Sequence, residues 1–166
     1  MFKLKTISKD AIPAAFERAE RYRQMNEPLD AESICHDILT IEPDNQRALK
    51  TLLLALSEQF GNSLYPAYEK AMEILSRLKD DYSKTFYEGI VYERRAKALI
   101  KRNGLGTGRM AYEWFRKAMH SYEIAIELGR SRNDDAVMRW NTCARIIMQN
   151  PEVEPELQGS NEQMLE

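Results

Sequence analysis

The residues of this chain that could do chemistry are two histidines, two cysteines and a glycine-rich stretch. Cys35 and His36 are adjacent, and adjacent residues of a helix point about 100° apart, so they do not form a nucleophile and base pair by themselves. His120 falls on an expected polar helix face. A carboxylate-bridged metal pair would need Glu-x-x-His motifs, which the sequence lacks. We therefore predict no catalytic residue, no metal site, no cofactor and no enzymatic activity.

The glycine-rich stretch NGLGTG runs from Asn103 to Gly108 and is followed by Arg109. Glycines before a helix N-terminus can expose backbone amides to an anion, which gives a phosphate-binding hypothesis. The stretch lacks the Lys-Ser/Thr ending and the preceding strand of a P-loop. Our interpretation is a connector between helices, with anion binding as the open alternative.

Charge and cysteine content exclude several classes of protein. Cys35 and Cys143 lie far apart without a CxxC spacing, so we expect buried free thiols. The formal net charge is −2, and the last sixteen residues hold five glutamates and no Lys or Arg. The remaining surplus of about +3 is too small to indicate nucleic acid. No segment approaches the roughly 20 apolar residues of a membrane span, so we expect a soluble, cytoplasmic protein without a membrane partner.

Apolar residues recur at helical spacing along most of the chain, and no strand-like alternation of useful length occurs. The sequence therefore predicts an all-α fold of about seven helices. Ser8 or Asp10 is expected to cap the first helix and Asp134 the last one. The expected helices cover about residues 11–25, 31–42, 46–60, 67–79, 83–102, 109–128 and 134–149.

The clearest helical pattern is AMHSYEIAIELG, from Ala118 to Gly129. Ala118, Tyr122 and Ala125 lie on one face, and a face that alternates small and large residues can receive another helix closely. A related spacing of large and small residues occurs at Gly89 and Tyr92, and again in the helix that carries Trp140, Cys143, Ala144 and Ile147.

This combination resembles the tetratricopeptide repeat family, whose unit of about 34 residues places small and large residues on two antiparallel helices. The resemblance covers about residues 11–149 and is irregular in the middle. It implies a right-handed array of antiparallel helical hairpins, an α-α superhelix, over residues 1–150. The expected hairpins span about 11–42, 46–79 and 83–128, with a capping helix at 134–149 and an acidic C-terminal tail at 151–166.

The resemblance also implies a function, because the first helices of successive hairpins line a concave groove in that family. We expect this groove to bind a peptide segment or helix of another protein, as a non-enzymatic adaptor or scaffold. The expected partner-binding residues are Phe16, Glu20, Arg23, Arg47, Lys50, Leu54, Phe86, Ile90, Asn141 and Arg145. The Lys and Asn clamp by which some members hold a carboxylate is not reproduced, since Glu20 and Leu54 stand where it needs Asn.

Several alternatives stay open. The chain could be a structural subunit or homo-oligomer that uses its helical faces for assembly, or, as a third class, an enzyme or phosphate-binding protein. The basic half of the fifth helix, from Arg94 to Arg102, could be a patch for an acidic partner or only a solvated helix end. Glu152, Glu154 and Glu156 of the tail could dock on basic side chains and compete with a partner.

Overall fold

The computed structural model describes residues 1–61, 66–129 and 134–155. Within these ranges the chain forms seven α-helices and one short 3-10 helix and contains no strand, which confirms the all-α fold. The elements are η1 (Lys9–Ala11), α1 (Ile12–Gln24), α2 (Pro28–Ile41), α3 (Gln46–Ser57), α4 (Ala67–Ser76), α5 (Asp81–Arg102), α6 (Thr107–Leu128) and α7 (Asp135–Gln149).

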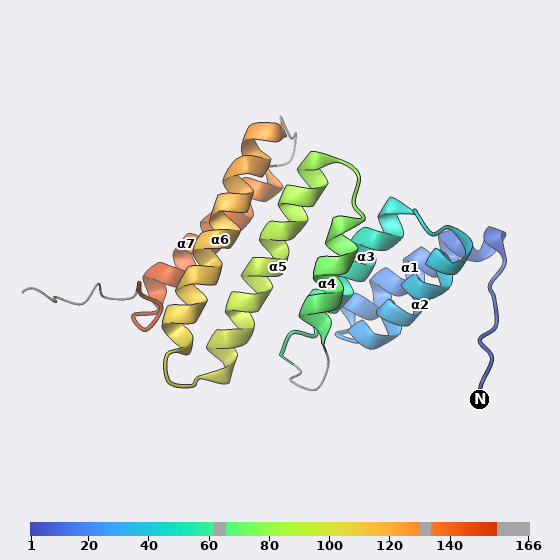
Figure 1. The fold of residues 1–166 in the computed structure, drawn as a ribbon, viewed down its shortest axis with the longest axis horizontal. Coiled ribbons are helices and arrows are strands. Elements are labelled where there is room, and N and C mark those ends of the chain that lie inside the picture. The colour runs from blue at the N-terminus through green and yellow to red at the C-terminus, as the bar shows by residue number, and fades with distance from the viewer. Residues whose placement is uncertain (62–65, 130–133, 156–166) are drawn as a thin grey trace, which may run out of the picture.

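Helices that follow one another in sequence also pack against one another, so the molecule is a linear array (Figure 1). α1 and α2 lie at one end and α7 at the other. α5 and α6, the two longest helices at 22 residues each, share the most extensive contact of any pair. α3 also touches α1 and α5, which places alternate helices side by side on one face of the array.

The helix starts are only partly those expected from the sequence. Asn45 caps α3, because its Oδ1 accepts a hydrogen bond of 3.0 Å from the Ala48 amide, and Asp80 caps α5 in the same way at 2.7 Å from the Ser83 amide. The sequence predicts a side-chain cap from Ser8 or Asp10 at the first helix and from Asp134 at the last, but Ser8 and Asp134 form no such bond and Asp10 lies inside η1. Asp134 has a positive φ of 50°, outside the extended backbone of a usual N-cap residue.

Two hydrophobic cores hold the array together. The first is built from α1 to α4 and centres on fully buried residues such as Leu49, Leu52 and Leu53. The second is built from α5 to α7 around Phe115 and Tyr122. α5 belongs to both, since Val91 packs in the first core and Ile90 in the second. The α5 helix is therefore the element through which the two cores are joined.

The close packing of α5 on α6 depends on Gly89. A Cβ atom at this position would lie 2.5 Å from Cε1 of Tyr122, whose side chain is fully buried. The Tyr122 ring is also held by a hydrogen bond from its hydroxyl to Glu93. The ring therefore occupies the space that any other residue at position 89 would need.

The packed chain continues beyond α7. Val153 is 2 % exposed and belongs to the second core. The backbone carbonyl of Glu152 lies so close to Gly108 that a Cβ there would clash with it. The boundary expected at residue 150 thus falls short of the packed structure, because the segment after α7 folds back on the α5–α6 turn; residues 156–166 lie outside the described ranges.

We predict that Gly89→Ala lowers the free energy of unfolding. Overpacking a core costs about 1–3 kcal/mol, against a gain of about 1 kcal/mol from replacing glycine inside a helix. A net loss of about 1 kcal/mol should be visible in urea denaturation followed by circular dichroism. Gly61→Ala is the control, because no described atom lies within 4 Å of the added Cβ. Equal or higher stability of Gly89→Ala would contradict the assigned contact.

Candidate functional site

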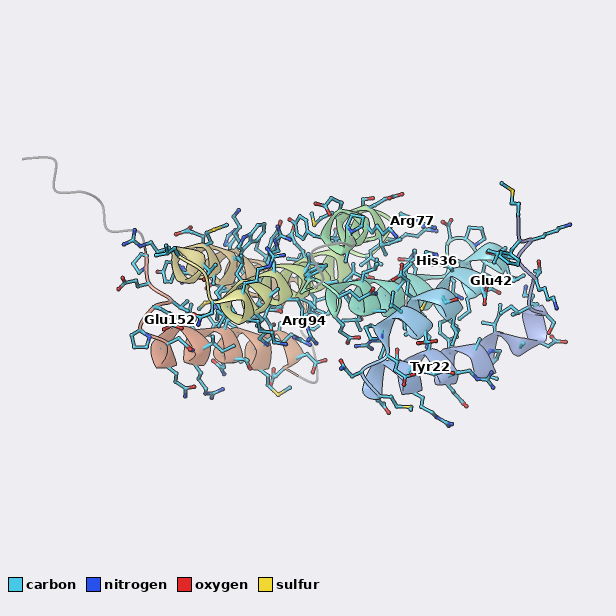
Figure 2. The ribbon with its side chains drawn as sticks, turned by 90° about the horizontal axis from the view of Figure 1, so that it is seen from below. Tyr22, His36, Glu42, Arg77, Arg94 and Glu152 are labelled. Atoms are coloured by element: carbon cyan, nitrogen blue, oxygen red, sulfur yellow. The ribbon has the colours of Figure 1, made fainter. Side chains whose placement is uncertain are left out.

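A hollow of about 340 Å³ lies between the C-terminal ends of α3, α5 and α7. We call it the α3–α5–α7 hollow. Figure 2 shows one of its residues, Arg94, in the middle of the array between α7 and the N-terminal helices. Its walls are Ser57, Glu58, Phe60, Gly61, Arg94, Lys97, Ala98, Ile100, Lys101, Ile146 and Asn150.

The hollow combines apolar and charged walls. Phe60, Ala98 and Ile146 supply apolar surface from three parts of the chain. Arg94, Lys97 and Lys101 supply positive charge from one face of α5. Such a mixture can hold a side chain by burial and fix its orientation by charge.

Glu58, the only carboxylate among the described residues of the wall, is already paired. Arg23 of α1 donates to both oxygens of Glu58, from Nε to Oε2 at 3.3 Å and from Nη2 to Oε1 at 2.7 Å. Both side chains are only 16 % exposed. This bidentate pair links α1 to the end of α3 and leaves no free negative charge from Glu58 in the hollow.

A second, deeper network fixes the α5 wall. Glu93 is 1 % exposed, and its carboxylate accepts hydrogen bonds from Lys97, from the Tyr122 hydroxyl at 2.6 Å and from Arg139 Nη1 at 3.0 Å. Burial opposes ionisation of Glu93. The hydrogen bond and charge of Lys97, aided by Tyr122 and Arg139, outweigh burial and hold the pKa of Glu93 below its usual range. The network therefore joins α5, α6 and α7 through an ionised carboxylate.

The residues predicted on α1 and α3 mostly bond to one another. Arg47 lies over the Phe16 ring, with its guanidinium carbon 4.3 Å from the ring centroid. Glu20 accepts from Thr51 at 3.1 Å and from Arg23 at 3.0 Å. The contacts of Arg47 with Phe16 and of Thr51 with Glu20 hold α1 against α3.

Lys50 and Asn141 lie apart from that cluster. Lys50 Nζ is 3.6 Å from Asp80 Oδ2, and the side chain reaches the Tyr87 ring at 6.0 Å. Asn141 is half-buried on α7 and Arg145 is exposed there. None of the ten predicted residues lines the hollow, whose α7 wall is made instead by Ile146 and Asn150.

Burial corrects two of the predictions directly. Phe16 is 4 % exposed within the first core and Ile90 is 2 % exposed within the second, so neither side chain can contact a partner. Leu54 and Phe86 are partly buried against the second core. The apolar residues of the predicted groove therefore serve packing between helices.

The sequence could have indicated the three cationic residues of the hollow. Arg94, Lys97 and Lys101 follow the i, i+3, i+7 spacing of one helix face, which places them together on α5. The contribution of Glu58 and Asn150 had no such signal, since these residues stand at helix ends that meet only through tertiary packing.

The histidines do not converge with other reactive groups. His36 Nε2 lies 3.6 Å from Glu32 Oε1, and His120 Nδ1 lies 3.9 Å from Glu123 Oε2, each on its own helix. Both histidine side chains are more than half exposed. Across residues 1–61, 66–129 and 134–155, no group of three His, Cys, Asp or Glu side chains could hold a metal ion.

The glycine-rich stretch borders a second, wider hollow of about 620 Å³. Its lining includes Arg109 but also Glu152 and Glu154. Figure 2 shows Glu152 at the α7 end of the array. Two carboxylates at this position oppose an anion, and the approach of the Glu152 backbone accounts for Gly108. The expected docking of Glu156 lies outside the described residues.

No family model, no curated protein and no solved structure matches this chain. The tetratricopeptide resemblance therefore rests on the residues quoted for it. In the part of the chain that is described, none of the helices is both long and apolar enough to cross a membrane.

We predict that Glu93 makes stability depend on pH in the acid range. Because its folded pKa is below the unfolded value of about 4.3, its contribution is complete above that value and is lost as the pH falls through the folded pKa. Glu93→Gln should lose on the order of 3 kcal/mol at pH 7, since Arg139 and Lys97 keep no charged partner. On acidification, the free energy of unfolding of Glu93→Gln should then fall by less than that of the wild type.

Urea unfolding at pH 7 and at several values below about 4.3 measures both effects. Glu127→Gln, which changes an exposed carboxylate of α6, is the matched control. The assignment fails if Glu93→Gln and wild type show the same pH dependence.

We also predict that both thiols are unreactive in the folded protein. Burial, with a smaller contribution from Glu20, raises the pKa of Cys35 to about 12, and burial with Glu93 does the same for Cys143. Neither side chain is exposed. A disulfide reagent at pH 8 should label neither thiol in buffer and both in denaturing urea. Rapid labelling of the native protein would show that one of these thiols is not enclosed.

Proposed function

We propose that this protein is a non-enzymatic interaction module that binds a peptide segment or helix of another protein along the face formed by α1, α3, α5 and α7. The observation that carries the proposal is the α3–α5–α7 hollow, to which three successive odd-numbered helices contribute walls. A surface assembled from separate hairpins suits an extended ligand, because each helix can contact a different part of it.

The chemistry of the hollow supports binding rather than catalysis. Of the described residues that line it, none is a histidine, cysteine or aspartate. The Ser57 hydroxyl donates to the Leu54 carbonyl at 2.7 Å, and Glu58 is held by Arg23. A nucleophile and a base within hydrogen-bond reach, which covalent catalysis requires, do not meet there.

The rigidity of the walls also supports recognition. Arg23 fixes Glu58, Glu93 fixes Lys97, and Asn150 donates from Nδ2 to the Ile146 carbonyl at 2.6 Å. Side chains that are already held lose little further entropy when a ligand arrives. A ligand therefore meets these three side chains already held in place.

The test begins with selection of peptides by the full chain from a displayed random library. Affinities of the selected peptides are then measured for Arg94→Ala and Ile146→Ala, which truncate opposite walls of the hollow. Truncation of a central contact costs more than about 1 kcal/mol, so we expect Kd to rise about fivefold or more.

Arg116→Ala and Ile126→Ala are the matched controls, since both residues lie on α6 outside the hollow and are exposed. They should leave Kd unchanged, and thermal unfolding should show that all four variants fold. Failure to select any peptide would reject the proposed function. Selected peptides that bind all four variants equally would place the site elsewhere.

A further inference from the structure

We infer that the α3–α5–α7 hollow recognises an acidic segment, in which an Asp or Glu side chain lies next to an apolar one. This inference rests on the proposed function and adds the chemistry of the ligand to it. The argument depends on which charges in the hollow are already neutralised by the protein and which are not.

Three cations line one side of the hollow. Arg94, Lys97 and Lys101 belong to successive turns of α5 and all contribute to the wall. Their spacing of three and four residues places them on one helix face, within reach of a single ligand segment. Lys101 is exposed, whereas Arg94 and Lys97 are half-buried.

Two of the three cations have no acidic partner among the residues that the structure describes. Lys97 is bonded to Glu93. Neither Arg94 nor Lys101 forms an ion pair with any carboxylate of the described residues. In addition, Arg94 Nε is buried and donates to no acceptor within the described structure. The rest of the Arg94 side chain is only half-buried, so a ligand carboxylate could bond to the accessible end of its guanidinium group through a charge-assisted hydrogen bond, which is among the stronger kinds.

The carboxylates near the hollow do not cancel this positive charge. Glu58 is neutralised by Arg23 through two hydrogen bonds. Glu93 carries one negative charge against the two positive charges of Lys97 and Arg139. Glu20 lies one turn before Arg23 on α1, and its carboxylate is bonded to Arg23 and Thr51. The charge presented to a ligand at the α5 wall is therefore positive.

The helix dipoles disfavour an anion in the hollow, but they are weaker than the charges of the cationic side chains. The C-terminal ends of α3, α5 and α7 all border the hollow, and each carries about half a negative charge that fades within the last turn. Lys101 and Arg102 stand in the last turn of α5, where they complement its dipole. The full charges of Arg94 and Lys101 outweigh these partial charges, so an anionic group is preferred over a cationic one.

The apolar walls favour a peptide over a nucleic-acid backbone. Phe60 and Ile146 enter the hollow from α3's end and from α7, with Ala98 beside the cations. A nucleic-acid phosphate backbone would bury no apolar surface against these side chains. A peptide with an apolar residue next to a carboxylate would bury that residue there, which favours binding. The chemistry therefore points to an acidic peptide with an apolar residue.

The experiment uses the full chain and three pools of peptides about twelve residues long, which extend to about 40 Å. All pools share Leu, Ile and Phe at the same positions; the other positions hold Asp and Glu, Asn and Gln, or Lys and Arg. Binding is measured by fluorescence anisotropy at low and at high salt. We expect the acidic pool to bind at least tenfold tighter than the neutral pool, with a preference that shrinks as salt rises.

The double variant Arg94→Glu with Lys101→Glu should lose the acidic preference and gain affinity for the basic pool. Arg116→Glu with Lys84→Glu changes the net charge equally at exposed positions outside the hollow and should behave like the wild type. Circular dichroism confirms that both variants fold.

The outcomes separate this inference from the proposed function. Equal or tighter binding of the neutral or basic pool overturns the acidic preference while peptide binding stands. Equal effects of the two double variants also overturn it, because the preference would then come from overall charge. Failure of every pool to bind rejects both proposals, and tighter binding of a duplex oligonucleotide than of the acidic pool would replace the peptide by a nucleic acid.

Discussion

The ionised carboxylate of Glu93 is the group on which the arrangement of the last three helices depends. Burying a charge is costly unless it is paired and hydrogen-bonded, and here the donors come from α5 itself, from α6 and from α7. A shift of α6 or α7 relative to α5 would remove one of these donors from the buried charge. Lys97 is both a partner of Glu93 and a wall of the hollow, so the buried network also sets the shape of the surface.

The sequence predicted most of the fold because the fold is built from local patterns. The spacing of apolar residues predicted all seven helices. It also predicted a packing face at Ala118, Tyr122 and Ala125, and all three side chains are fully buried. The function of Gly89 follows the same logic, because a small residue opposite a tyrosine permits close approach. These features depend on residues within one helix or on neighbouring helices.

The contacts that form the candidate site could not be predicted in this way. Arg23 bonds to Glu58 across 35 positions of the chain and Arg139 bonds to Glu93 across 46, with no spacing rule to connect them. The family resemblance also predicted partner contacts for Phe16 and Ile90, but both side chains lie on the buried side of their helices. A rotation of part of a turn is enough to exchange a core position for a surface one.

The division into two cores has a consequence for local unfolding of the helical array. Phe60 of the hollow belongs to the first core, whereas Ile100 and Ile146 pack against the second. Local unfolding of either core would therefore destroy the hollow. A ligand held there binds only when both cores are folded, and at about 100 times its Kd it would add about 2.7 kcal/mol to the cost of opening either one. Occupancy of the hollow would thus link the stability of the two cores, which are otherwise joined through α5.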